Sequence, residues 1–212
     1  MLTQTQYYAS LEDREIHEGG FLGHAQAQKL KVIPDEAPNA TDVEESIKKL
    51  KANDKELKAL NLNNIKNVSI ERLVEVCQAL RGNTFCVKLD MAAVAANDKV
   101  AKALAESLEE NETLKTVNVE SNFISGEMIV ELLKAINKKQ ALLELRVANQ
   151  KPEVLGNKVE MQIAKLLKEN STLLRLGIQF EFPDARIKVH DRLKENLDVL
   201  RKKRTGKAGG DS

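Results

Sequence analysis

Apolar residues recur along the chain in one local pattern, at offsets 0, 3 and 5 from each start. The pattern occurs five times, and its successive starts are 29, 28, 28 and 31 residues apart. Within each occurrence apolar and polar positions alternate, which is typical of a strand with one buried face. The pattern therefore predicts five short strands, starting near Leu57, Cys86, Leu114, Leu142 and Leu173.

Between these runs lie stretches whose apolar residues are three and four positions apart, as in a helix with one buried face. A fixed period with an LxxLxL core is the signature of a leucine-rich repeat, in which each unit is strand, loop, helix and return. The predicted fold is α/β, a right-handed leucine-rich-repeat solenoid of about five strand–helix repeats with a parallel sheet. The predicted helix stripes are Leu73, Val76, Cys77 and Leu80; Val100, Leu104 and Leu108; Met128, Ile129, Leu132, Leu133 and Ile136; and Ile163, Leu166 and Leu167.

Both ends of such an array need a cap, because a terminal repeat would otherwise expose its core. The capping box Thr41-Asp-Val-Glu44 predicts the start of a helix that carries Ile47 and Leu50. At the other end, residues 186–203 predict a helix that covers the last repeat with Ile187, Leu193, Leu197 and Leu200. We expect a flexible lead-in at 1–40, a repeat domain with its capping helices at 41–204 and a flexible tail at 205–212.

Composition narrows the class of protein. With 42% hydrophobic and 31% charged residues, the chain is an ordinary soluble globular protein. No apolar run approaches the roughly 20 residues that span a bilayer, and the start of the chain lacks a secretory signal, so we expect no membrane partner and a cytoplasmic location. The net charge of +1 argues against nucleic acid as a partner. Cys77 and Cys86 lack metal-ligand spacing, and we interpret them as reduced, buried, small hydrophobic residues rather than reactive thiols.

Charge is unevenly distributed. Residues 186–207 contain nine basic and three acidic residues, a local charge of +6 against +1 for the whole chain. Such asymmetry marks either a contact surface or a solvated tail, and both interpretations stay open.

No catalytic motif is present. A glycine-rich phosphate loop, HExxH, CxxC and a nucleophile elbow are all missing, and the concave-face positions at offsets 4 and 6 bring no acid–base pair together. Asn122, at offset 8, is expected to bond the backbone of the turn that leaves its strand, and His190 to lie on the surface. The chain is therefore expected to be a binding module, not an enzyme, without cofactor or metal.

Two sets of positions depart from the core pattern. Offset 9 should face outward, yet it holds Phe123 and Phe182 beside Lys66, Ala95 and Lys151. Offset 1 changes from lysine to leucine at Leu143 and Leu174. Exposed apolar residues rimmed by lysines indicate a protein-binding surface. The alternative is that Phe123 folds back onto its own loop.

Several strings are specific enough to indicate a family: PDEAPNATDVEES from Pro34, LNLNNI from Leu60, LKTVNVESNFISG from Leu114, LGNKVEM from Leu155 and RKKR at 201–204. The chain resembles the C-terminal part of the tropomodulins over nearly its whole length. The resemblance implies capping of the pointed end of actin filaments, without nucleotide hydrolysis, in the cytoplasmic cytoskeleton that includes sarcomeric thin filaments. Tropomyosin would be a partner through N-terminal segments that have no counterpart here, and without their avidity this chain should bind actin more weakly.

The resemblance also implies contact residues. The family's apolar actin contacts correspond to Ala92, Phe123 and Leu174, although Ala92 is smaller than the family's aliphatic residue there. The basic end, Arg201, Lys202, Lys203 and Arg204, would face acidic actin; otherwise it is a solvated helix end, suited to the helix dipole, or a nuclear-localisation signal. With Lys151 and Phe182 from the offset-9 set, these residues complete the expected actin-binding site.

Two other functions compete with capping. A leiomodin-like fragment would nucleate actin, but leiomodins carry a proline-rich extension and a further actin-binding helix after the repeats, and neither follows here. A ribonuclease-inhibitor-like scaffold would regulate an enzyme, but such arrays are longer and have charged or aromatic concave faces.

Overall fold

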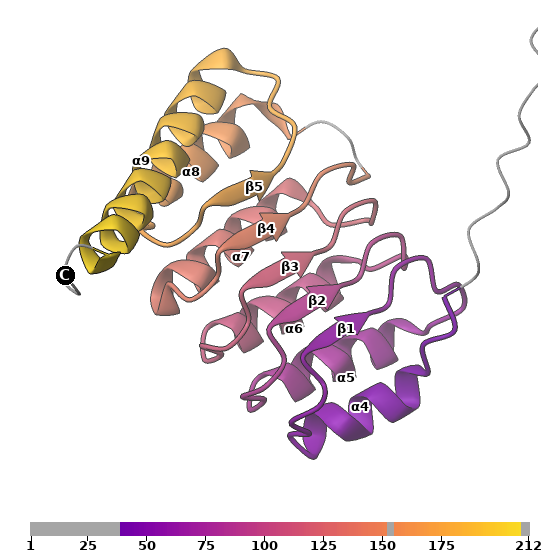
Figure 1. Ribbon diagram of the computed structural model, residues 1–212. Coiled ribbons are helices and arrows are strands. Elements are labelled where there is room, and N and C mark those ends of the chain that lie inside the picture. Colours follow the sequence, from indigo (N-terminus) through magenta and orange to yellow (C-terminus); the bar gives the residue numbers. More distant parts are fainter. Residues whose placement is uncertain (1–38, 152–154, 209–212) are drawn as a thin grey trace, which may run out of the picture. The chain divides into compact units, whose positions relative to one another are not determined.

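The five strands form one parallel sheet in the order β1-β2-β3-β4-β5 (Figure 1). They are β1 (Ala59–Asn61), β2 (Lys88–Asp90), β3 (Thr116–Asn118), β4 (Glu144–Arg146) and β5 (Arg175–Gly177). The pairing register aligns Leu60, Leu89, Val117, Leu145 and Leu176, which are the offset-3 residues of the five repeats. The predicted repeat period is therefore confirmed residue by residue.

This computed structural model describes residues 39–151 and 155–208. The lead-in predicted for 1–40 and the last residues of the predicted tail lie almost entirely outside these ranges.

A layer of helices packs on one face of the sheet, and each helix except the last leads the chain into the next strand (Figure 1). The helices are α4 (Val43–Lys51), α5 (Ile70–Leu80), α6 (Asp98–Leu108), α7 (Gly126–Lys139), α8 (Gly156–Lys168) and α9 (Pro183–Ala208). The predicted stripes on α5, α6, α7 and α8 all face the single hydrophobic core, with Met128 and Leu166 only partly buried at its margin. None of the helices in the described ranges combines the length and apolarity needed to cross a membrane.

The predicted helix covers the N-terminal end of the array, but its N-cap residue differs from the prediction. The N-cap of α4 is Asp42, whose carboxylate accepts hydrogen bonds from the backbone N–H groups of Glu44 and Glu45. Thr41, which the capping box had placed there, instead donates from its hydroxyl to the side chain of Asn39. Asp42 is the N-cap residue because its carboxylate reaches two of the free N–H groups at the positive end of the helix dipole.

The C-terminal helix departs further from expectation. It begins at Pro183, which suits the first helical position, and continues through 205–208, which we had assigned to the tail. Its buried face is formed by Ala185, Val189 and Asn196, while Ile187 is 56% exposed and Leu197 44% exposed. The prediction that Ile187 and Leu197 cover the last repeat is wrong. The apolar residues of α9 are spread around the helix, so the sequence does not show which side of the helix packs against the last repeat.

Hydrogen bonds from one buried and one partly buried side chain attach α9 to the last repeat. The amide of Asn196 donates to the backbone oxygens of Asn170 and Leu173, at 3.1 and 2.8 Å, and the Nε of Arg192 donates to Asn170 O at 2.9 Å. These bonds satisfy carbonyl groups that the next repeat would otherwise satisfy, so α9 acts as the predicted cap through polar contacts as well as packing.

Both cysteines are free and buried, as expected. Burial raises the pKa of the Cys77 thiol from 9.0 to about 12 and also raises that of Cys86. Neither thiolate is therefore available near neutral pH.

We expect a thiol reagent such as Ellman's to react with neither cysteine in the native protein at pH 8 and with both in denaturant. Between pH 9 and 12 the unfolded state loses the Cys77 proton and the folded state keeps it, so stability should fall as pH rises through this window. A Cys77→Ala variant should lose less stability over the same window, measured by denaturant titration. Rapid native labelling would show that the thiols are accessible.

Candidate functional site

The offset-9 residues lie in the loops that follow the strands. Lys66, Ala95, Phe123, Lys151 and Phe182 are all exposed, and we call this row the loop ridge. Phe123 is 51% exposed and Phe182 36%, so the prediction that offset 9 faces outward is confirmed. The alternative in which Phe123 folds back onto its loop does not describe the structure.

Asn122 holds the loop ridge from beneath. Its side-chain oxygen accepts hydrogen bonds from Val94 N and Ala96 N, at 3.1 and 3.0 Å. Its amide donates to Met91 O, Val119 O and Glu120 O. Asn122 therefore bonds the turn that leaves its own strand, as predicted, and also the equivalent turn of the preceding repeat.

Gln150 does the same in the next repeat, which the sequence analysis missed. Its Oε1 accepts from Ile124 N at 3.1 Å, and its Nε2 donates to Val119 O at 2.8 Å. A glutamine at offset 8 was a usable signal, because it carries the same amide as asparagine on a side chain one methylene longer.

Asn122→Ala should lower the free energy of unfolding by about 3 kcal/mol, because it leaves buried backbone groups of two loops unpaired. Denaturant titration measures the loss. Lys151→Ala, at the exposed offset-9 position next to Gln150, is the control and should change stability little. Equal stability of both variants would contradict the role of Asn122.

The backbone also fixes the spacing of the loop ridge. Phe123 N donates to Ala96 O at 2.8 Å, and Lys151 N donates to Asn122 O at 3.0 Å. Each bond joins a ridge loop to the loop of the repeat before it. Phe123 and Lys151 are therefore presented by loops that are joined to their neighbours, at the separation set by adjacent repeats.

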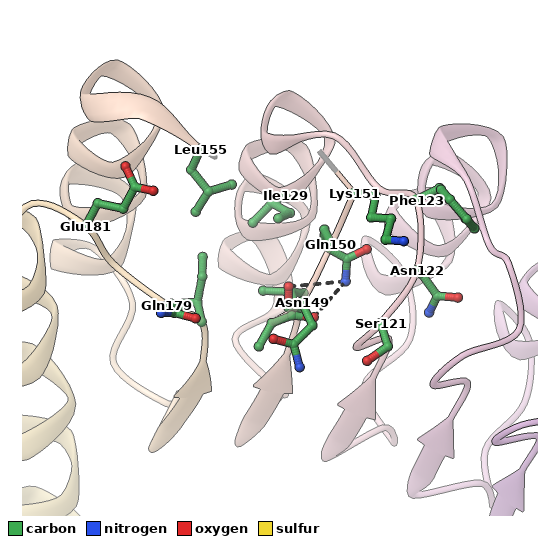
Figure 2. A pocket seen from close by; sticks show the side chains of 13 residues that line it. Ser121, Asn122, Phe123, Ile129, Asn149, Gln150, Lys151, Leu155, Gln179 and Glu181 are labelled. Atoms are coloured by element: carbon green, nitrogen blue, oxygen red, sulfur yellow. Dashed lines mark hydrogen bonds between the residues drawn. The ribbon is translucent and has the colours of Figure 1, made fainter. Parts of the chain in front are cut away.

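A hollow of about 620 Å³ opens beside Phe123 and Lys151 (Figure 2). Figure 2 shows these two residues on one side of it, with Gln179 and Glu181 on the other. Its lining includes the apolar residues Ile129, Val147, Leu155 and Ile178. The ridge thus borders a recess with apolar walls and a charged rim, a shape suited to a partner's side chain.

Leu174 lies at the other end of the strands. It belongs to a second row, which we call the strand-start row, formed by Lys58, Val87, Lys115, Leu143 and Leu174. Its backbone groups are also linked: Leu174 N donates to Leu143 O and Leu143 N to Lys115 O, both at 2.8 Å. Val87 and Leu143 are each 39% exposed, and Leu174 is partly exposed. The structure therefore separates Leu174 from Phe123 by the length of the sheet.

Ala92 lies between the two rows, on the strand face opposite the helices. It is the second residue after β2 and is partly exposed. Farther along this face, Arg146 and Glu120 form a two-pronged ion pair, with contacts of 3.1 and 2.8 Å. A Cβ at Gly177 would come within 3.2 Å of both of these side chains, so glycine leaves room for the pair. A partner that contacts both rows must therefore lie across this face.

The basic residues Arg201–Arg204 are exposed near the end of α9. At about 1.5 Å of rise per residue, Arg201 lies about 28 Å from Phe182 along the helix axis. Because Asn196 bonds Leu173 O, the helix passes the start of β5, and the basic end projects beyond the strand-start row (Figure 1). Apart from Ala92, the predicted site residues thus form two groups, one at each end of the strands.

Within the described residues, no group of three or more histidine, cysteine or acidic side chains could hold a metal ion. His190 is exposed, as expected. The two rows and the recess offer surfaces for binding.

Comparison with known families gives the same fold and also indicates a family. The model described as the "TMOD/LMOD Leucine-rich domain" matches residues 39–199, which is most of the chain. The chain belongs to the tropomodulin and leiomodin family. Human Tropomodulin-4 is 36% identical over 205 residues, and the tropomodulin of Caenorhabditis elegans is 37% identical over 210 residues. Human Leiomodin-2 is 43% identical over a shorter stretch of 166 residues.

Solved structures of the tropomodulin and leiomodin family share this architecture. The C. elegans tropomodulin C-terminal domain superposes with a TM-score of 0.76 at 38% identity, covering 78% of this chain and 99% of that one. A structure described as Leiomodin-1 actin-binding site 2 gives the same score and identity, covering 83% and 100%. The matched stretch covers 96% of this chain but only 59% of human Tropomodulin-4, and 98% but only 54% of the C. elegans protein. The stretch matched to human Leiomodin-2 covers 78% of this chain and 30% of that protein.

Proposed function

We propose that this chain is an actin-binding module that caps the pointed end of actin filaments and so regulates their length. The observation that carries the proposal is Phe123, a half-exposed aromatic at the centre of the loop ridge, in a domain that aligns with an actin-binding site of leiomodin-1. An exposed aromatic beside a recess is a typical anchor of a protein interface.

The two groups of site residues suggest how the module acts. Phe123, Lys151 and Phe182 form one contact, and Leu174 with the basic end of α9 forms the other. A surface that touches actin at both ends of the strands can span more than one subunit and obstruct the site where the next monomer would bind. No covalent chemistry is required, so the proposal is for a non-catalytic protein.

The positive charge near the end of α9 contributes mainly to the rate at which the chain associates with actin. Actin's surface is acidic, and exposed basic side chains raise the association rate more than the affinity. We therefore expect a variant with Arg201, Lys202, Lys203 and Arg204 replaced by glutamine to cap more slowly and with a weaker dependence on salt. Stopped-flow association at two ionic strengths measures this, and an unchanged salt dependence would assign these residues to a solvated helix end.

The proposal implies a cytoskeletal location in the cytoplasm, at filament pointed ends and, in muscle, at the thin filaments of sarcomeres. Tropomyosin is proposed as a partner of the family's N-terminal region and not of these repeats. Membranes and nucleic acids are not expected partners.

Elongation of pyrene-labelled actin from filaments with blocked barbed ends tests the proposal. Titration with the chain should slow elongation in a dose-dependent way and slow depolymerisation equally, because a cap blocks both addition and loss of monomers. No slowing at high protein concentration would overturn the capping proposal.

Nucleation is the second candidate, favoured by the 43% identity to Leiomodin-2. Spontaneous polymerisation of pyrene-labelled actin, with no blocked filaments present, separates the two functions. A nucleator shortens the lag of spontaneous polymerisation, whereas a pointed-end cap leaves the lag unchanged and slows growth only when barbed ends are blocked.

A further inference from the structure

The last member of the loop ridge is held differently from Phe123 and Lys151. Phe123 N and Lys151 N each donate to a backbone oxygen of the preceding loop. Phe182 N instead donates to the carboxylate of Glu160, at 3.0 Å, and Glu181 N donates to the other oxygen of the same carboxylate, at 2.9 Å. One acidic side chain therefore replaces the loop-to-loop hydrogen bond at the end of the ridge.

Glu160 lies inside the molecule. It is on α8 and is 0% exposed, so it cannot touch a partner itself. Its two hydrogen bonds reach the N–H groups at the start of α9, which carry the positive end of the helix dipole. A buried carboxylate is costly unless it is hydrogen-bonded, and both of its oxygens have a partner here.

The fifth repeat also lacks the amide that supports the earlier loops. Asn122 and Gln150 at offset 8 accept hydrogen bonds from Ala96 N and Ile124 N, beside the second and third ridge positions, so each supports the loop of the repeat before its own. The offset-8 residue of the fifth repeat is Glu181, which is exposed at the rim of the recess and contributes only its backbone N–H. The fifth repeat is followed by α9 and not by another strand, so Glu160 supplies from the preceding helix the acceptor that an offset-8 amide of the next repeat supplies to the second and third loops.

We infer that Glu160 is a positioning residue for actin binding, whose buried carboxylate holds Phe182 in place at the end of the loop ridge. The inference rests on the proposed function for its effect on actin, but the contact itself can be tested without actin. Removing the charge should let the Glu181–Phe182 loop move and weaken the contact that Phe182 makes.

Glu160→Gln is the sharpest test, because glutamine keeps the size of the side chain but turns one acceptor into a donor that opposes an N–H. In proton–nitrogen NMR spectra of the whole chain, the amide protons of Glu181 and Phe182 should move upfield, since both lose a charged acceptor. Unchanged Glu181 and Phe182 resonances would overturn the inference, whatever the chain does to actin.

A double-mutant cycle then tests whether Glu160 acts through Phe182. In the wild-type background Glu160→Gln should raise the concentration for half-maximal slowing of elongation about fivefold, and in the Phe182→Ala background less than about twofold. An equal effect in both backgrounds would show that Glu160 supports the fold in general and not this contact. A wild-type chain that fails to slow elongation would instead refute the proposed function, and the NMR result would still decide the placement of Phe182.

Ser107→Ala is the matched control. Ser107 is a buried polar residue on α6, 1% exposed, and its hydroxyl donates to Cys77 O and Ala103 O. Its loss should destabilise the fold without moving the ridge, so half-maximal slowing should stay at the wild-type concentration at temperatures where the chain is folded. If Ser107→Ala weakened capping as much as Glu160→Gln, destabilisation alone would explain the effect, and the positioning role would be rejected.

Discussion

Val119→Asp is expected to leave the chain unfolded at room temperature. Val119 follows β3 at offset 5 of its repeat and is 1% exposed. Its backbone N–H donates to Arg146 O, and its carbonyl accepts from the amides of Asn122 and Gln150. An aspartate there would bury a charge without a partner, at a cost of about 5 kcal/mol, against a typical total stability of about 5–15 kcal/mol.

Circular dichroism and thermal unfolding measure this outcome, and the chain offers a matched control. Val199 on α9 is 50% exposed, so Val199→Asp makes the same chemical change in water and should leave the midpoint within a few degrees of wild type. A soluble, folded Val119→Asp protein would contradict the repeat register described here.

Phe123→Asp is expected to abolish most of the affinity for actin while leaving the fold intact. The side chain is 51% exposed, and the bonds that hold its loop come from the backbone and from Asn122, so stability should change by less than about 1 kcal/mol. Loss of a central aromatic anchor typically costs about 2 kcal/mol or more of binding free energy, and the new charge would be desolvated beside the recess. Half-maximal slowing of elongation should therefore move to a concentration about 30-fold higher or more.

Ile187→Asp provides the comparison for Phe123→Asp. Ile187 is a large apolar side chain, 56% exposed, on α9 and outside both rows, so its replacement should leave actin binding unchanged. A large drop in thermal midpoint for Phe123→Asp would show that this residue supports the core, and equal capping by the two variants would remove Phe123 from the proposed contact.

Most of the repeat architecture could be read from local spacing. The alignment of Leu60, Leu89, Val117, Leu145 and Leu176 in the sheet follows directly from the LxxLxL period, because each repeat buries the same positions as its neighbour. The outward direction of Phe123 follows from the same period, since a residue between two inward positions of a loop must face water. The support from Asn122 was equally predictable, because a short amide after a strand bonds the turn that follows.

Other features depended on contacts between segments distant in the sequence. The period could not show that Arg146 and Glu120 form a two-pronged ion pair on the strand face between the two rows. Nor could it assign the buried face of α9, whose apolar residues do not form one stripe.

The sequence by itself determined the repeat, the sheet and the outward position of the ridge, because those depend on spacing within one unit and on its repetition. Only the tertiary structure decided that Ala185 and Val189 face the core in place of Ile187, and that Glu160 holds Phe182 from a distance of 22 residues. The physical reason is the same in both cases. The end of the array has no following repeat, so free backbone groups and exposed apolar surface there are satisfied by whichever side chains the docked helix brings near, and no local pattern specifies them.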